Sequence, residues 1–248
     1  MAMLKKQNKV RIVIFSLDDP IISFPFLFHM LKNDNLDINM VIIPQGFFQI
    51  SRLFKIFLMF FSFNFFKEII LSFLKNRSVS NLLKKNNKPV IYPKNINSSD
   101  LINILKDINP DYLLSFNCPQ KFSDQLLNLP KKNFINIHFG MLPQYRGLSP
   151  IFHSAYNKEN EIGITFHIMK SYFDEGPIIM QKRLNISKEK SVFNIYQLAL
   201  DLTCKSLTEF SDLLKNQKIE IISNEIYKTS YFGYPSLKKI LRYKFRLN

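Results

Sequence analysis

Cysteine and glycine are scarce in this chain of 248 residues, and each shortage excludes a class of site. Two cysteines, Cys118 and Cys204, are too few for a disulfide scaffold or for a CxxC zinc site. The six glycines form neither a GxGxxG nor a GxxxxGKS/T motif, so we expect no dinucleotide site and no phosphate-binding P-loop. The first apolar run is also too short for a signal peptide. These shortages predict a cytoplasmic protein that holds no metal ion.

Acidic residues are also few, since 34 Lys and Arg face 19 Asp and Glu and give a formal net charge of +15. Such a charge suits a nucleic acid, a phosphorylated small molecule or an anionic membrane surface. Lysine is also the default surface residue of a chain this rich in Asn, Ile, Lys and Phe. Charge alone therefore does not favour a nucleic acid as the partner.

Long uninterrupted hydrophobic runs are absent as well. The longest charge-free run in the most apolar region, residues 56–66, is well short of the ~20 residues that span a bilayer. Ten of the 25 phenylalanines lie between Phe47 and Phe73, which predicts a helical insertion over about residues 47–75. Burial of one or two helices is the favoured interpretation. A surface helix that contacts a membrane or a partner chain, as in a homodimer, is the alternative.

Short apolar, β-branched runs alternate with helical patterns through most of the chain. The runs cover residues 10–15, 38–43, 89–92, 112–116 and 134–138. This order predicts an α/β fold with a Rossmann-like, mostly parallel sheet and helices on both of its faces. The fold is expected to form a catalytic domain of residues 1–190. Two extended runs, 163–169 and 177–186, predict an antiparallel addition to the sheet. Residues 191–248 are expected to form a C-terminal helix and a short extended tail.

Residues with catalytic chemistry gather between positions 134 and 183. Asn136 and His138 alternate with apolar residues in a strand, so both side chains point to the same side. An amide can donate to a developing oxyanion, and an imidazole can move a proton at neutral pH. Asp174 lies in a Gly-Pro turn 36 residues after His138, where a carboxylate could fix the imidazole tautomer and stabilise its charged form. His29, His153 and His167 are expected to have structural roles.

Three segments in this region, NIHFGMLPQYRG, GITFHIM and FDEGPIIMQ, resemble the folate-dependent formyltransferase family. That family includes methionyl-tRNA formyltransferase, glycinamide ribonucleotide formyltransferase and the nucleotide-sugar N-formyltransferases. The resemblance implies N10-formyltetrahydrofolate as the formyl donor and catalytic roles for Asn136, His138 and Asp174. It also implies that the pterin is held by Ser115, Phe116, Asn117, Cys118, Pro119, Ser171, Tyr172 and Phe173. Phe139-Gly140-Met141 departs from the family pattern at the floor of the site.

The amine acceptor is expected to be a nucleotide-linked amino deoxysugar used for a bacterial surface polysaccharide such as the lipopolysaccharide O-antigen. About sixty residues follow the core, fewer than the β-barrel of the similar tRNA enzymes needs, and the Tyr-rich tail resembles that of surface-sugar formyltransferases. Acidic residues after the first strand suit an ammonium or sugar hydroxyls. The candidate substrate contacts are Ser16, Asp18, Asp19, Gln144, Tyr145 and Arg146. A methionyl-tRNA formyltransferase-like enzyme, or a membrane-docking or partner-docking protein on an inactive formyltransferase core, are the alternatives.

Overall fold

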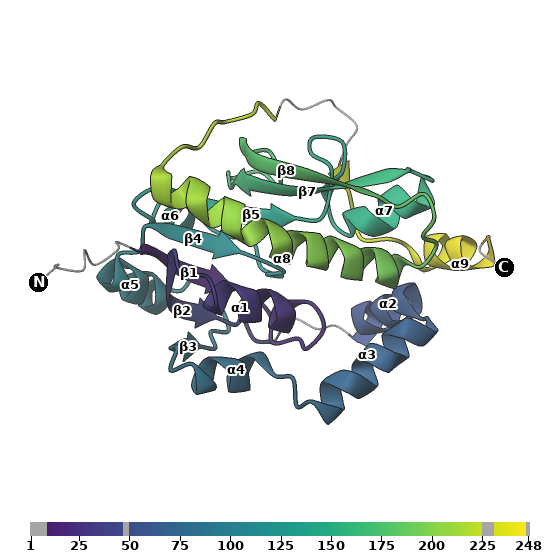
Figure 1. The fold of residues 1–248 in the computed structure, drawn as a ribbon, viewed down its shortest axis with the longest axis horizontal. Helices are drawn as coiled ribbons and strands as arrows, with labels where there is room; N and C mark the ends of the chain where they lie inside the picture. The colour runs from purple at the N-terminus through teal and green to yellow at the C-terminus, as the bar shows by residue number, and fades with distance from the viewer. Residues whose placement is uncertain (1–8, 47–49, 225–230, 247–248) are drawn as a thin grey trace, which may run out of the picture.

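The computed structural model describes residues 9–46, 50–224 and 231–246, and within them one seven-stranded sheet forms the centre of the molecule (Figure 1). The strand order is β3-β2-β1-β4-β5-β7-β8. These strands are β1 (Val10–Phe15), β2 (Leu36–Ile42), β3 (Val90–Ile91), β4 (Tyr112–Ser115), β5 (Asn133–His138), β7 (Glu161–Ile168) and β8 (Ile178–Asn185). The helices are α1 (Ser23–Leu31), α2 (Ile50–Phe60), α3 (Phe63–Leu74), α4 (Val79–Lys85), α5 (Ser99–Ile108), α6 (Asp124–Leu127), α7 (Pro150–Tyr156), α8 (Val192–Asn216) and α9 (Leu237–Phe245).

The five strands from β3 to β5 are parallel, and β7 and β8 extend the sheet in antiparallel fashion. Alternate residues of β1 enter different cores, with Ile12 and Ile14 on one face and Val13 and Phe15 on the other. The sheet is therefore covered by helices on both faces, as the sequence predicts. Strand β1 pairs with both β2 and β4, so the strand order grows toward β3 on one side of β1 and toward β5 on the other. Ligands bind beyond the carboxyl ends of the strands at such a change in the order.

Helix α8 belongs to the same packed unit as the N-terminal strands. Its residues Val192, Ile195 and Phe210 share a core with Ile12 and Ile14 of β1, and the helix crosses the front of the sheet in Figure 1. The apolar stripe of α8 thus covers the same face of the sheet as α1. Residues 1–8, 47–49, 225–230 and 247–248 of the predicted domains and insertion lie outside the described residues.

The phenylalanine-rich insertion forms two helices, α2 and α3, as predicted, but the expectation that they are buried is wrong. Only their inner side packs, through residues such as Met59, Phe60 and Phe65, while Phe63 and Phe73 are 83% and 86% exposed. Among the described residues, no single helix is long and apolar enough to cross a membrane. Residues 53–60 and 63–85 meet that test only as a pair bent by 116°.

A second, two-stranded sheet ties the C-terminal segment to the loop after β5. Strand β6 (Arg146–Gly147) pairs in parallel with β9 (Tyr231–Phe232). Gly147 has a φ of +96°, and a Cβ atom there would lie 2.2 Å from the carbonyl oxygen of Phe232. Only glycine permits this approach, which holds the tail beside the carboxyl end of β5.

Candidate active site

A pocket of about 440 Å³ lies at the carboxyl ends of β4 and β5. Its walls come from the segment after β4, the end of β5, the start of α7 and the segment after β7. All eight residues that the resemblance assigns to the pterin line it, namely Ser115, Phe116, Asn117, Cys118, Pro119, Ser171, Tyr172 and Phe173. The structure thus brings two distant segments together at one pocket, as the sequence analysis expects of a donor site.

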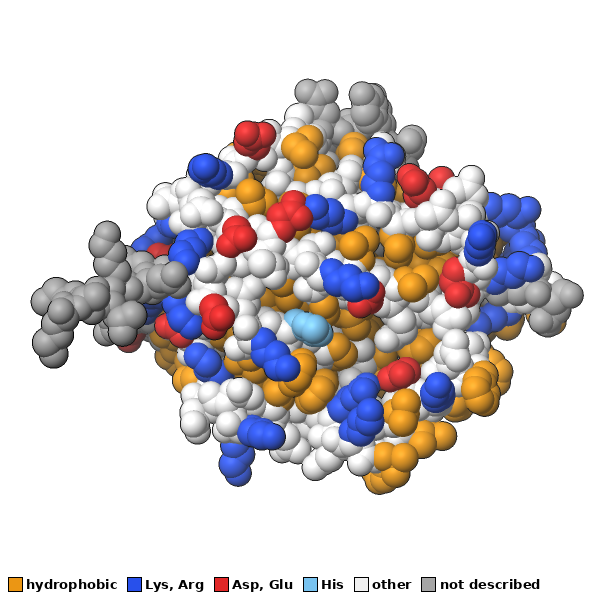
Figure 2. All heavy atoms as spheres, in the orientation of Figure 1, with side chains coloured by type: hydrophobic (Ala, Val, Ile, Leu, Met, Phe, Trp, Pro, Cys, Tyr) orange, Lys and Arg blue, Asp and Glu red, His pale blue; other side chains and the backbone are white. Residues whose placement is uncertain are grey.

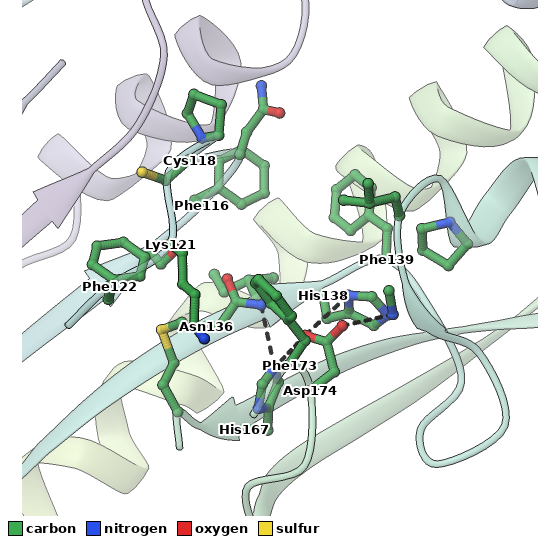
Figure 3. A pocket seen from close by; sticks show the side chains of 18 of the residues that line it. Phe116, Cys118, Lys121, Phe122, Asn136, His138, Phe139, His167, Phe173 and Asp174 are labelled. Carbon is green, nitrogen blue, oxygen red and sulfur yellow. Dashed lines mark hydrogen bonds and ion pairs between the residues drawn. The ribbon is translucent and has the colours of Figure 1, made fainter. Parts of the chain in front are cut away.

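Asn136 reaches the pocket from β5, between the neighbouring strands β4 and β7. Its Nδ2 atom lies 3.2 Å from Nε2 of His167, the residue opposite it on β7 (Figure 3). Nδ1 of His167 is 3.2 Å from the Ile168 carbonyl oxygen, which can only accept, so Nδ1 donates. The neutral ring therefore presents Nε2 as an acceptor, and His167 fixes the orientation of the Asn136 amide.

His138 ends β5 with an imidazole that is only 7% exposed. Its Nε2 atom lies 2.7 Å from the carbonyl oxygen of Tyr145 and therefore donates, which leaves Nδ1 as the acceptor in the neutral ring. Gly140 makes this contact possible, because a Cβ atom at residue 140 would lie 2.6 Å from both Nε2 and the Tyr145 oxygen. The main chain, and not a carboxylate, fixes the tautomer.

Asp174 connects the two histidines. Its Oδ1 atom lies 3.7 Å from Nδ1 of His138 and 3.5 Å from Nε2 of His167, and Oδ2 accepts the Gly147 N–H at 2.8 Å. The residue has a φ of +55°, a left-handed conformation that Asp adopts more readily than most residues. Asn224 supports this turn by donating to the Asp174 carbonyl oxygen at 2.9 Å.

The Asp174 carboxyl group is held in its ionised form. Burial raises its pKa, but the charge of His138 when protonated, a hydrogen bond and charge from protonated His167 and the Gly147 N–H lower that pKa well below its usual range. By contrast, burial raises the pKa of the Cys118 thiol to about 12, so the cysteine in the pocket wall is protonated at neutral pH and is a poor nucleophile. The ionised carboxylate can therefore stabilise a positive charge on either imidazole.

This lowered pKa predicts how Asp174→Asn changes stability with pH. A carboxylate with a lowered pKa stabilises the fold above its unfolded pKa of about 4, and that contribution is lost as pH falls toward the folded pKa. We expect the variant to lose roughly 2 kcal/mol at pH 7 and the difference from the wild type to shrink below about pH 4. Urea unfolding as a function of pH measures it.

Asp107→Asn is the matched control, because Asp107 is exposed near the end of α5. We expect it to leave the free energy of unfolding almost unchanged at every pH. A loss in Asp174→Asn that stayed constant down to pH 2 would contradict the pH argument.

The predicted substrate contacts are the part of the site that the structure does not assemble, since Ser16, Asp18, Asp19, Gln144, Tyr145 and Arg146 are not among the pocket-lining residues. Asp19 accepts from the first backbone N–H groups near α1, and Asp18 accepts from Val79 N–H and Ser80 Oγ. Arg146 donates to the Phe173 carbonyl oxygen and pairs with Glu175. These charges cap helices and hold the active-site loop.

His167 is the main residue that the sequence analysis misses. It lies on β7, only 1% exposed, and reading the strand alone gives it a structural role. The feature that could have identified His167 is its position, because the segment GITFHIM forms the strand that pairs with the strand of Asn136. Lys121, Tyr196 and Tyr231 also line the pocket, and none of them belongs to a sequence motif that would have identified it. No group of three or more His, Cys, Asp or Glu among the described residues has the geometry to hold a metal ion.

The chain is similar to known formyltransferases in sequence and in fold. Methionyl-tRNA formyltransferase of Thermotoga neapolitana is 31% identical over 151 residues, which are 61% of this chain and 48% of that enzyme. The chain thus spans about half the length of the curated relatives it matches.

Two solved structures share the fold. The sugar 3N-formyl transferase WlaRD has a TM-score of 0.62 and 20% identity, covering 91% of this chain and 70% of that one. Glycinamide ribonucleotide transformylase 1 of Symbiobacterium toebii has a TM-score of 0.64 and 13% identity, covering 93% and 96%.

The family itself is established by a match that takes in most of the site. Residues 71–210 match the family model described as Formyl transferase, and this span is more than half of the chain. It includes Asn136, His138, His167 and Asp174, the four side chains that the structure connects. The chain therefore belongs to the formyl transferase family.

Proposed function

We propose that this protein is a cytoplasmic N-formyltransferase that uses N10-formyltetrahydrofolate to formylate the primary amine of a nucleotide-linked amino deoxysugar for a surface polysaccharide. One observation carries the transfer chemistry. Asn136, His138 and Asp174 meet at one pocket, with the His138 tautomer set so that Nδ1 can accept a proton. An amide donor, an imidazole base and an ionised carboxylate are the groups that acyl transfer to an amine requires.

The pocket fits a folate in size and in the chemistry of its walls. Its volume of about 440 Å³ lies within the usual range for small-molecule sites, roughly 300–1,000 Å³. Aromatic side chains offer flat surfaces to a ring system, and those lining the pocket are Phe116, Phe122, Phe139, Tyr172, Phe173, Tyr196 and Tyr231. When bound, the folate would supply the formyl carbon that the amine attacks.

His138 would act as the general base. An amine must lose a proton as its nitrogen forms the new bond, and Nδ1 of His138 can accept that proton because Nε2 is committed to the Tyr145 carbonyl. The charged ring then has an ionised carboxylate 3.7 Å from Nδ1. Asp174 would therefore stabilise the imidazolium without taking the proton itself. The ring could then return the proton to the donor nitrogen as the bond between that nitrogen and the formyl carbon breaks.

Asn136 would stabilise the negative charge that develops on the formyl oxygen. An amide nitrogen carries two N–H bonds, and one of them is directed at His167. The other would donate to an oxygen in the pocket. Because His167 holds the amide in place, no reorientation is needed when charge develops, and such preorganisation is the main source of oxyanion stabilisation.

The exposed rim of the pocket supports a nucleotide-linked acceptor. Tyr172, Phe173 and Tyr231 line the pocket and are 72%, 48% and 51% exposed, which suits stacking against a nucleobase. Nζ of Lys121, a further lining residue, lies 5.5 Å from the Phe173 ring centroid and offers a cation to a diphosphate. The similar sugar 3N-formyl transferase was solved with dTDP and 5-N-formyl-THF.

Formylation of Met-tRNA is the second candidate, favoured by the methionyl-tRNA formyltransferases among the sequence relatives. The test is incubation with N10-formyltetrahydrofolate and, separately, nucleotide-linked 3-amino and 4-amino deoxysugars, glycinamide ribonucleotide and Met-tRNA. We expect mass spectrometry to show one added formyl group on an amino sugar, formed roughly 10²–10⁴-fold more slowly with His138→Gln. Formylation of Met-tRNA and of no sugar would overturn the proposed acceptor.

A further inference from the structure

Helices α2 and α3 present a continuous apolar surface that the formyl-transfer pocket does not use. Ten large hydrophobic side chains on these helices and the turn between them are exposed, and they are Leu53, Phe54, Phe57, Phe61, Phe63, Phe66, Ile69, Ile70, Phe73 and Leu74. None of them lines the pocket. Figure 2 shows hydrophobic side chains gathered at the corner of the molecule where Figure 1 places α3. Soluble monomers rarely expose apolar patches of this kind without a partner.

The outward direction of these side chains is fixed by packing on the opposite side of the helices. Phe65 of α3 is 8% exposed and lies 5.3 Å, between ring centroids, from Phe193 of α8. On the outer side, Phe61 lies 5.6 Å from Phe57 and 5.3 Å from Phe66, which joins the two helices into one surface. The apolar face is therefore a built feature of the fold.

Helix α9 extends this surface and adds positive charge to it. The helix is fastened to the turn after α2, where Nζ of Lys244 donates to the Phe61 carbonyl oxygen at 2.8 Å. Leu237, Leu241 and Phe245 are spaced four residues apart and are 40%, 38% and 75% exposed, so they form a second apolar stripe. The neighbouring residues Lys238 and Arg242 are exposed as well.

Charge identifies the occupant of this surface. The exposed cations of residues 53–77 and 231–246 are Lys67, Lys75, Lys238, Arg242 and Arg246. The one acidic residue of these segments, Glu68, pairs with Arg77 at 3.1 Å. A second copy of the same surface would bring like charges together, whereas anionic lipid headgroups would neutralise them. We infer that α2, α3 and α9 form a docking surface for an anionic membrane, with the apolar side chains inserted at the boundary between headgroups and acyl chains.

The dimensions of the helices suit an orientation parallel to the membrane. Helices α2 and α3 have 11 and 12 residues and are therefore about 17 Å long, about half the thickness of a hydrocarbon core. Helices with an apolar face and flanking Lys and Arg bind in the interface plane. Each basic residue at an anionic surface increases binding about fivefold, and each inserted phenylalanine about tenfold or more.

Vesicle flotation of the full chain tests this inference. The vesicles contain phosphatidylglycerol mixed with phosphatidylcholine, or phosphatidylcholine alone. We expect binding to the anionic vesicles only, weakened by added salt. The apolar variant is Phe63→Ser with Phe73→Ser and the charge variant is Lys238→Gln with Arg242→Gln, and each should lower binding by about twentyfold or more. The matched control, Ile104→Ser with Lys106→Gln on the distant helix α5, should bind as the wild type does.

Circular dichroism and formyl transfer check that the variants are intact, and the substituted positions are exposed so that folding tolerates them. Retained transfer with lost flotation supports a docking surface separate from the pocket. Absence of flotation, or equal flotation with neutral vesicles, would overturn the inference. A dimer in sedimentation velocity that the Phe63→Ser, Phe73→Ser variant dissociates, without vesicle binding, would assign the surface to a second copy of the chain and overturn it as well.

Discussion

Replacing His138 with glutamine is expected to lower the turnover of formyl transfer by roughly 10²–10⁴-fold while the protein stays folded. Glutamine places an N–H donor near the position of the imidazole Nε2, so the hydrogen bond to the Tyr145 carbonyl can be kept. It has no group that accepts a proton at neutral pH. The loss should therefore appear in kcat, measured with saturating folate and acceptor, and the thermal midpoint should change little.

The control for this variant is His29→Gln, which changes an exposed histidine on α1. It should transfer formyl groups at the wild-type rate. If His138→Gln also kept wild-type turnover, the proton would have to be accepted elsewhere in the pocket. His167 is the other imidazole there, so the same measurement on His167→Gln would follow.

Much of the fold was predictable because its strands are short, apolar runs bounded by turn residues. The run Val10–Phe15 is apolar on both faces of the pleat, and both faces are buried in the structure. A strand buried on both sides must be covered by helices on both sides, and this requirement alone restricts the fold to a layered α/β arrangement. The packing of α8 was less predictable, because its apolar stripe does not show what the helix packs against.

The grouping of Asn136, His138 and Asp174 was predictable because polar residues at the end of a buried strand have few structural reasons to be there. Asn136 and His138 share one face of β5, and Asp174 follows in a Gly-Pro turn. His167 was not identified because a lone histidine in an apolar strand resembles a satisfied core residue. Its role depends on the register of β7 against β5, which places it opposite Asn136, and register is a tertiary property.

Charged loop residues were the least predictable part of the site. Asp18, Asp19 and Arg146 lie near the strand ends where ligands bind, but each is already engaged by a helix terminus or by a neighbouring loop. A short acidic side chain before a helix can either cap it or bind a ligand, and the sequence does not separate the two. The exposure of α2 and α3 was similarly hidden, because the apolar side of a helix is ordinarily its buried side, whereas much of it faces outward here.

The arrangement of Tyr145, His138 and Asp174 differs from a simple proton relay. The Tyr145 carbonyl oxygen sets the tautomer of neutral His138, and in the proposed mechanism the ionised Asp174 would stabilise the charge that the ring acquires. Loss of Asp174 should therefore change stability as well as rate. Loss of His138 should act mainly on rate, because the conservative variant can keep the buried hydrogen bond and Asp174 keeps His167 and the Gly147 N–H as partners.

Asn136→Ala is expected to lower kcat by roughly 10²–10³-fold with little change in KM, because its amide would donate to charge that develops only in the transition state. Asn136→Asp should be at least as damaging, because a carboxylate keeps the shape but accepts hydrogen bonds and repels the developing charge. The matched control is Asn133→Ala, which removes the same side chain from the other end of β5, outside the main pocket. It should keep wild-type kcat. A rise in KM at unchanged kcat in Asn136→Ala would show that the residue binds substrate uniformly and does not stabilise the oxyanion.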